Sequence, residues 1–152
     1  GEKTGVALKR YLDYLQTRAE ASGIMLGCYQ ENVTSWLGFE GVTAATRLMN
    51  EALKTAIAEE ARDPVGNKGL RDKIVREKLA LDHVWLINYQ AFKKQAEAAG
   101  VPFIGPADPQ EACRTWIRAC ADFNVKAHRE TTSEAAFQKY QKELLEKCAT
   151  AQ

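Results

Sequence analysis

Apolar and small side chains recur every three or four residues along most of this chain, the periodicity of helices that pack along one face. Over residues 3–37 this pattern predicts a helical segment whose inward stripe is Leu8, Leu12, Leu15, Ala19, Ser22, Leu26, Tyr29, Val33 and Trp36. Gly23 and Gly27 weaken a helix interior. The segment is therefore one long helix or two, and we favour a break near Gly23. Residues 38–41, Gly-Phe-Glu-Gly, are expected to end it, since glycine commonly follows a helix C-terminus.

Two further helices are predicted in the middle of the chain. The first covers residues 42–62 and places its stripe on Val42, Ala45, Met49, Ala52 and Ala56. It is expected to stop at residues 63–67, Asp-Pro-Val-Gly-Asn, a composition typical of turns. The second covers residues 68–99 and ends at Gly100, with its stripe on Leu70, Ile74, Leu81, Trp85, Asn88, Phe92 and Ala99.

Capping signals mark the starts of two last helices. One begins at Asp108 and Pro109 and runs to about residue 128, with Cys113, Trp116, Ile117, Cys120 and Phe123 inward. The other begins at residues 131–134, Thr-Thr-Ser-Glu, and buries Phe137, Tyr140, Leu144 and Cys148. No segment alternates with the period of a strand. We therefore predict an all-α fold, a single domain over residues 1–152 that forms a bundle of about five helices without a β-sheet.

The composition narrows the class of protein. A chain of 152 residues is long enough to bury a core without a metal. The 21 Lys and Arg against 20 Asp and Glu give a net charge of +1, which argues against a nucleic-acid partner. No apolar run is long enough to insert into a membrane. The first residues do not resemble a signal peptide, so either the protein is cytoplasmic or its signal peptide is absent from the numbered chain.

The four cysteines carry the most specific prediction. Cys113 and Cys120 share a helix and lie ~10.5 Å apart along its axis, whereas a disulfide needs Cα atoms within about 7 Å. In an antiparallel hairpin, residues at equal height have position numbers with a constant sum, here about 261 for a turn near residues 130–131. Cys113 and Cys148 meet this condition. We therefore predict disulfides Cys113–Cys148 and Cys28–Cys120 that staple the bundle.

The alternative for these cysteines is four reduced, buried thiols in a cytosolic protein. A zinc site is not expected, because the sequence has no Cys-x-x-Cys pair. His83 and His128 are the only histidines, and neither has a Glu three residues before it as di-iron bundles require. A nucleophile elbow, a phosphate loop and a haem attachment motif are also lacking. We therefore predict no enzyme activity, no cofactor and no metal.

Two predicted loops are unusually apolar and are the candidates for a partner surface. They contain Trp36 and Phe39 in one loop and Phe103 and Ile104 in the other. Aromatic side chains on rigid loops are typical interface anchors. The alternative is that these side chains fold back and close the ends of the bundle.

We predict a periplasmic or secreted protein-binding module, the class that bacterial immunity proteins, inhibitors and secretion accessories represent. The first alternative is a carrier of a small apolar ligand, with a cavity of roughly 300–1,000 Å³ lined by Trp85, Phe92, Trp116 and Phe123. The second alternative is a cytosolic adaptor with reduced cysteines.

Overall fold

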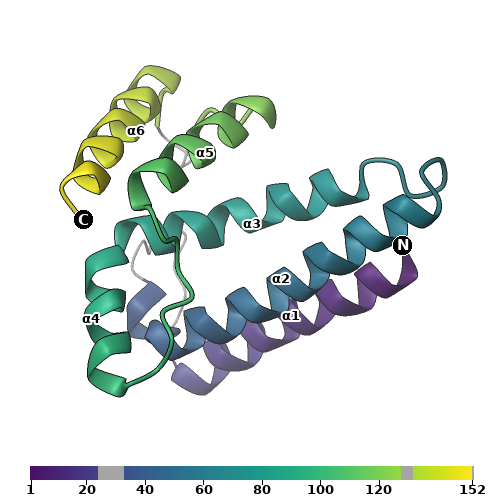
Figure 1. Ribbon diagram of the computed structural model, residues 1–152, viewed down its shortest axis with the longest axis horizontal. Helices are drawn as coiled ribbons and strands as arrows, with labels where there is room; N and C mark the ends of the chain where they lie inside the picture. The colour runs from purple at the N-terminus through teal and green to yellow at the C-terminus, as the bar shows by residue number, and fades with distance from the viewer. Residues whose placement is uncertain (24–32, 128–131, 152) are drawn as a thin grey trace. The chain divides into compact units, whose positions relative to one another are not determined.

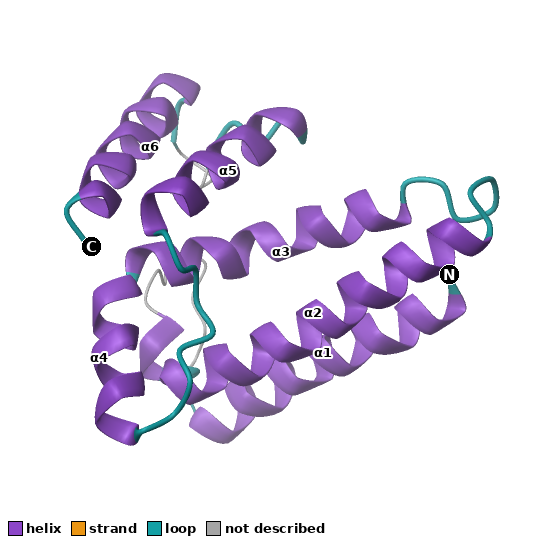
Figure 2. Ribbon diagram, viewed as in Figure 1, coloured by secondary structure: helices purple, strands orange, loops and turns teal. Residues whose placement is uncertain are grey.

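The computed structural model describes residues 1–23, 33–127 and 132–151, and this part of the chain contains helices and loops but no strand (Figures 1 and 2). The elements are α1 (Glu2–Ser22), a 3₁₀ turn η1 (Val33–Ser35), α2 (Gly38–Arg62), α3 (Leu70–Ile87), α4 (Tyr89–Ala99), α5 (Pro109–Asp122) and α6 (Glu134–Ala149). The predicted all-α class is confirmed. None of the described helices is both long and apolar enough to span a bilayer.

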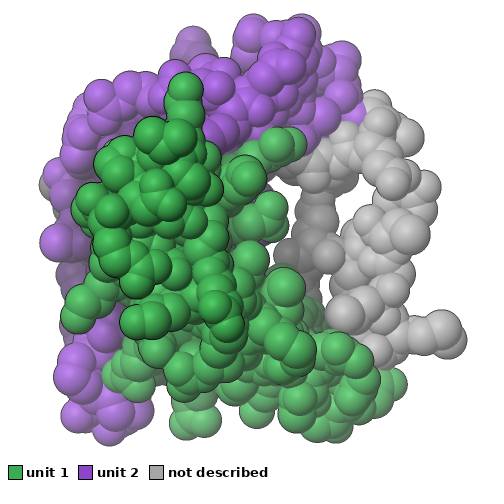
Figure 3. Space-filling view, turned by 90° about the vertical axis from the view of Figure 1, so that its right-hand side faces the viewer, with its two compact units in different colours: residues 1–78 green, residues 79–152 purple. Residues whose placement is uncertain are grey.

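The chain divides into two compact units (Figure 3). Unit 1 is Gly1–Lys78 and unit 2 is Leu79–Gln152, so the boundary falls within α3. The expectation of a single domain stays a prediction.

In unit 1, α1 and α2 lie side by side and run antiparallel (Figure 1). The predicted stripe of α2 is confirmed, since Val42, Ala45, Met49, Ala52 and Ala56 are completely buried. Three of these five residues are alanines, whose small side chains let helix backbones approach closely. The helix also ends where the turn composition predicts, with Asp63 as its C-cap.

The predicted inward face of α1 is wrong. Its buried residues are Thr4, Ala7 and Tyr11, whereas Leu8 is half-buried and Leu12 is 53% exposed. The reason is a contact that apolar spacing cannot reveal: Thr4 is hydrogen-bonded to the Glu59 carboxylate of α2. That contact turns the Thr4 face toward α2.

The structure tests three of the predicted helix boundaries. One is confirmed and two are different. The break near Gly23 is confirmed, because this residue is the left-handed C-cap of α1. Residues 38–41 do not end a helix but form the first turn of α2. The helix predicted over residues 68–99 divides at Asn88, whose side-chain amide donates to the Val84 carbonyl at 3.0 Å. Asn88 is therefore the junction of α3 and α4.

The core of unit 2 joins the end of α3 to the α5–α6 hairpin. It consists of Leu79, Leu86, Cys113, Trp116, Cys120, Phe137, Leu144 and Cys148. Asp108 caps α5 as predicted, since its carboxylate accepts the Glu111 N–H at 3.0 Å. Helix α5 stops at Asp122 rather than near residue 128, and Asn124 follows with a positive φ of 55°. Helix α6 is capped by Ser133, two residues later than expected.

Candidate functional site

The four predicted partner anchors differ in exposure, and none of them is fully exposed. Phe39 is buried in the first turn of α2, and Trp36 is half-buried. Phe103 and Ile104 are also half-buried. Of the two alternatives that the sequence left open, folding back of these side chains fits the burial of Phe39 better.

The loop of residues 101–106 is held against an aromatic cluster of unit 2. The Phe103 ring makes edge-on contacts with Trp85 and Tyr89, at centroid distances of 5.5 and 5.4 Å. A Cβ atom on Gly105 would lie 2.5 Å from the Phe103 ring and 2.7 Å from the Trp85 ring. Glycine is therefore required where the backbone passes under these rings.

The most exposed large apolar side chain in the described chain is on a different loop. Residues 63–69 connect α2 to α3 and are called the α2–α3 loop. Val65, between Pro64 and Gly66, is 88% exposed. From its composition, this segment was expected only to end a helix. The signal that was available is a β-branched apolar residue inside a Pro-x-Gly turn.

Hydrogen bonds within the α2–α3 loop fix its shape. The Asp63 carboxylate accepts the Gly66 N–H at 2.8 Å, and the Asp63 carbonyl accepts the Asn67 N–H at 3.0 Å. Asn67 in turn donates its side-chain amide to the Glu59 carbonyl at 3.1 Å. A Cβ atom on Gly66 would lie 2.2 Å from an Asp63 carboxylate oxygen, so a larger residue here would displace that carboxylate. Together these hydrogen bonds define a turn over residues 63–67.

Two consecutive glutamates at the end of α2 cap the first turns of two other helices, α3 and α1. Glu60 accepts the backbone N–H groups of Gly69 and Arg71, at 2.9 and 3.2 Å, and so caps the start of α3. Glu59 accepts the backbone N–H groups of Lys3 and Thr4 and caps the start of α1. A carboxylate suits both positions because the first N–H groups of a helix lack partners and carry partial positive charge.

The Glu59 carboxylate is ionised in this position. Hydrogen bonds from the Thr4 hydroxyl and the Thr4 backbone lower its pKa from 4.5 to about 2, against the opposing effect of burial. Arg62 lies 3.7 Å away and adds an ion pair. The side chains of Arg62, Lys68 and Arg71 are exposed, as are those of Asp63 and Asp72. The surface around the α2–α3 loop is therefore apolar at Val65 and carries charges of both signs beside it.

The hairpin register predicted from the cysteines is confirmed, but the bond is not. Cys113 and Cys148 are in hydrogen-bond contact as predicted, and Cys120 contacts Gln141, a pair whose position numbers also sum to 261. All three described cysteines are free thiols, with no disulfide at bonding distance. The predicted partner of Cys120, Cys28, lies outside the described residues.

Burial controls the acidity of the three thiols. It raises the pKa of Cys113 to about 12, with a further contribution from Cys148, and the pKa of Cys120 to about 11. Burial also raises the pKa of Cys148, but the hydrogen bond from Cys113 and the charge of Lys147 oppose this rise. The two thiols of the Cys113–Cys148 pair are therefore chemically unequal.

A pocket of about 250 Å³ opens beside this pair in unit 2. Its walls are the α3–α4 junction and the end of α6, and its lining residues are Leu86, Ile87, Asn88, Tyr89, Gln90, Ala91, Lys147, Cys148, Thr150 and Ala151. The four residues predicted to line a carrier cavity, Trp85, Phe92, Trp116 and Phe123, do not line it. Its volume is also below the range typical of ligand sites.

His83 belongs to an aromatic cluster. Its ring stacks on Trp116 with 5.0 Å between centroids, and its Nε2 lies 2.5 Å from the Tyr140 hydroxyl. These contacts give His83 a packing role in unit 2. The second histidine, His128, lies outside the described residues. Within the described ranges, no group of three or more side chains is arranged to hold a metal ion.

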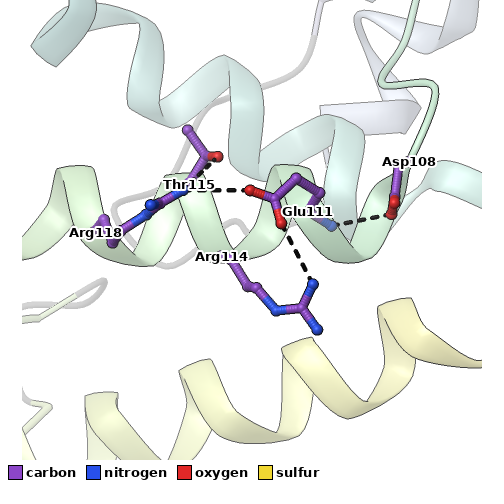
Figure 4. A network of polar contacts seen from close by, with 5 residues as sticks. All are labelled: Asp108, Glu111, Arg114, Thr115 and Arg118. Carbon is purple, nitrogen blue, oxygen red and sulfur yellow. Dashed lines mark hydrogen bonds and ion pairs between the residues drawn. The ribbon is translucent and has the colours of Figure 1, made fainter.

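The outer face of α5 carries an exposed polar network (Figure 4). Glu111 is 3.3 Å from both Arg114 and Arg118, and Arg118 also donates to Thr115 at 3.3 Å. Exposed ion pairs of this kind contribute little to stability. Both arginines are paired with the Glu111 carboxylate, which offsets part of their positive charge on this face of α5.

No protein-family model matches the chain, and no curated protein or solved structure is significantly similar to it.

Proposed function

We propose that this chain is a non-enzymatic helical module that binds another protein through the α2–α3 loop, with Val65 as the apolar contact. The observation that carries the proposal is the 88% exposure of Val65 on a loop whose backbone is hydrogen-bonded at Asp63, Gly66 and Asn67. An apolar side chain held in water adds nothing to the stability of its own unit. In an interface, the same side chain would be buried against a partner.

Order in the free loop favours binding for an entropic reason. A flexible loop loses conformational freedom when a partner fixes it, and that loss opposes association. The caps that Glu59 and Glu60 provide, together with the Asp63 turn, have already removed most of this freedom during folding.

The charges beside Val65 indicate the chemistry of the partner. Lys68 and Arg71 expose basic side chains around the loop, and Asp63 and Asp72 expose acidic ones. A complementary surface would present an apolar depression for Val65 with charges of both signs at its edge, the acidic ones opposite Lys68 and Arg71. Such charges speed encounter and exclude wrong partners more than they increase affinity.

We further propose that the protein works outside the cytoplasm, in the periplasm or as a secreted protein, with Cys113–Cys148 closed as a disulfide. The hydrogen-bond contact between these thiols supports this pairing. Oxidising compartments are where such bonds persist. Intact mass after alkylation of protein taken from its native compartment tests it: if Cys113 and Cys148 are alkylated without prior reduction, the module is a cytosolic adaptor instead.

Site-specific photo-cross-linking tests the binding surface. A photoreactive phenylalanine replaces Val65, or in a matched control Val6, which is 60% exposed on α1. After illumination in the native cells, adducts are identified by mass spectrometry. We expect a discrete protein adduct from position 65 that is absent from position 6 and is lost in a Lys68→Glu/Arg71→Glu background. No adduct from position 65, or identical adducts from both positions, would overturn the proposal.

A further inference from the structure

Cys148 is the member of the thiol pair that borders a pocket, although the residue itself is buried and only 2% exposed. It lines the 250 Å³ pocket of unit 2, together with its neighbour Lys147. Cys113 is completely buried and is not among the residues that line the pocket. A reagent that enters this pocket therefore meets Cys148 first.

The surroundings of the pair also distinguish the two sulfurs. Burial raises the pKa of both thiols, but Lys147 places a positive charge beside Cys148 and opposes this rise. At Cys113, burial and the neighbouring Cys148 both disfavour a thiolate. Because the thiolate is the attacking species in thiol–disulfide exchange, Cys148 is the better nucleophile.

We propose that the pocket admits small disulfides to Cys148, which opens an exchange reaction that Cys113 completes. This inference rests on the proposed Cys113–Cys148 disulfide and specifies how that bond forms. Because the pocket is smaller than ordinary ligand sites, the reagent it would admit is a disulfide of low molecular weight, and Cys148 would be its site of reversible modification.

The exchange balances without any further oxidant. The Cys148 thiolate attacks one sulfur of the small disulfide, the S–S bond of the reagent breaks, and one small thiolate leaves. This thiolate takes the proton of Cys113, which then attacks the Cys148 sulfur of the mixed disulfide. A second small thiol leaves, so two electrons pass from the protein thiols to the reagent.

Trapping variants test the order of the two steps. In a Cys28→Ser background, Cys113→Ala leaves Cys148 without its resolving partner, and Cys148→Ala leaves Cys113 alone. Each folded protein is treated with bis(2-hydroxyethyl) disulfide and mapped by mass spectrometry. We expect a stable adduct on Cys148 in the Cys113→Ala variant and no adduct on Cys113 in the Cys148→Ala variant. The Cys28→Ser parent should form a closed Cys113–Cys148 disulfide.

Two matched variants locate the entry route. Ala91→Trp fills the pocket, and Ala121→Trp places the same side chain at an exposed position of α5 outside it. The first should abolish most of the adduct on Cys148 in the Cys113→Ala protein, and the second should leave it intact. An adduct on Cys113 in the Cys148→Ala protein, or equal reactivity of Cys148 in the Ala91→Trp and Ala121→Trp proteins, would overturn the inference.

The same experiment separates this inference from the disulfide itself. If the parent closes the Cys113–Cys148 bond with the oxidant diamide while Cys148 forms no adduct with the small disulfide, the entry route is wrong and the disulfide stands. If no condition closes the bond in the folded parent, both proposals fail.

Discussion

The Glu59 carboxylate accepts hydrogen bonds from the hydroxyl and the backbone N–H of Thr4, at 2.7 and 2.9 Å, although the two residues lie 55 positions apart. Helix α1 has no side-chain cap of its own at its first turn. Glu59 supplies that cap from α2 and thereby decides which face of α1 is buried. Its neighbour Glu60 caps α3, so the end of α2 organises both adjoining helices and the loop between α2 and α3.

Replacing Thr4 by valine should destabilise the protein. Valine keeps the shape of threonine but removes the donor to Glu59, and hydrogen bonds to charged groups contribute about 2 kcal/mol. The free energy of unfolding, measured with urea, is expected to fall by about that amount. Thr17→Val, at an exposed position of the same helix, is the control and should change the value little. If both variants lower the free energy of unfolding equally, Glu59 does not stabilise α1 through Thr4.

Stability should depend on pH through Glu59. Its folded-state pKa is about 2, below the ordinary value of 4.5. A carboxylate with a lowered pKa stabilises the folded state above its unfolded pKa, and this contribution disappears as the pH falls from about 4.5 to about 2. Urea unfolding at about pH 6 and about pH 3 compares the native protein with Glu59→Gln. The difference in free energy of unfolding between the two proteins should be smaller at the lower pH. An unchanged difference would contradict the lowered pKa of Glu59.

Gly105→Ala should destabilise unit 2. The added methyl group would meet the rings of Phe103 and Trp85 at 2.5 and 2.7 Å, and overpacking of this kind typically costs about 1–3 kcal/mol. Near-ultraviolet circular dichroism should lose intensity as the edge-on aromatic contacts loosen. Gly5→Ala, where a Cβ atom meets nothing within 4 Å, should be neutral or stabilising. An unchanged spectrum in Gly105→Ala would mean that the 101–106 loop does not pack on these rings.

Asp63→Ala should loosen the α2–α3 loop without unfolding unit 1. The variant loses the carboxylate that accepts the Gly66 N–H, and an ordinary hydrogen bond contributes about 1 kcal/mol. Amide hydrogen exchange at Gly66 should accelerate, while exchange in the middle of α2 stays slow. Asp13→Ala, on the exposed surface of α1, should leave exchange in the loop unchanged. If Gly66 exchanges equally fast in the native protein and in Asp63→Ala, Asp63 does not order the turn.

Local signals in the sequence predict much of this fold. The apolar stripe of α2, the Asp108 cap and the break at Gly23 each depend on a few neighbouring residues, and the structure reproduces them. The sequence also predicted that Cys113 lies opposite Cys148 in the α5–α6 pair, although the connection, residues 123–133, is longer than the expected turn.

The remaining features depend on contacts between distant segments. Apolar spacing favours a Leu8–Leu12 face for α1, and only the Glu59 contact selects the Thr4 face instead. The exposure of Val65 depends on how Glu59 and Asn67 hold the loop. Neither the partner of a capping carboxylate nor the exposure of a turn residue follows from periodicity.

Binding through Val65 requires an α2–α3 loop that is ordered before any partner arrives. Backbone ¹⁵N relaxation on the free protein measures this directly. Order parameters at Val65 and Gly66 should match those of α2, at about 0.85, the value of a rigid backbone. Values below about 0.6 would show that the loop is flexible on the picosecond-to-nanosecond timescale, and Val65 would then be an ordinary exposed loop residue rather than a preformed contact.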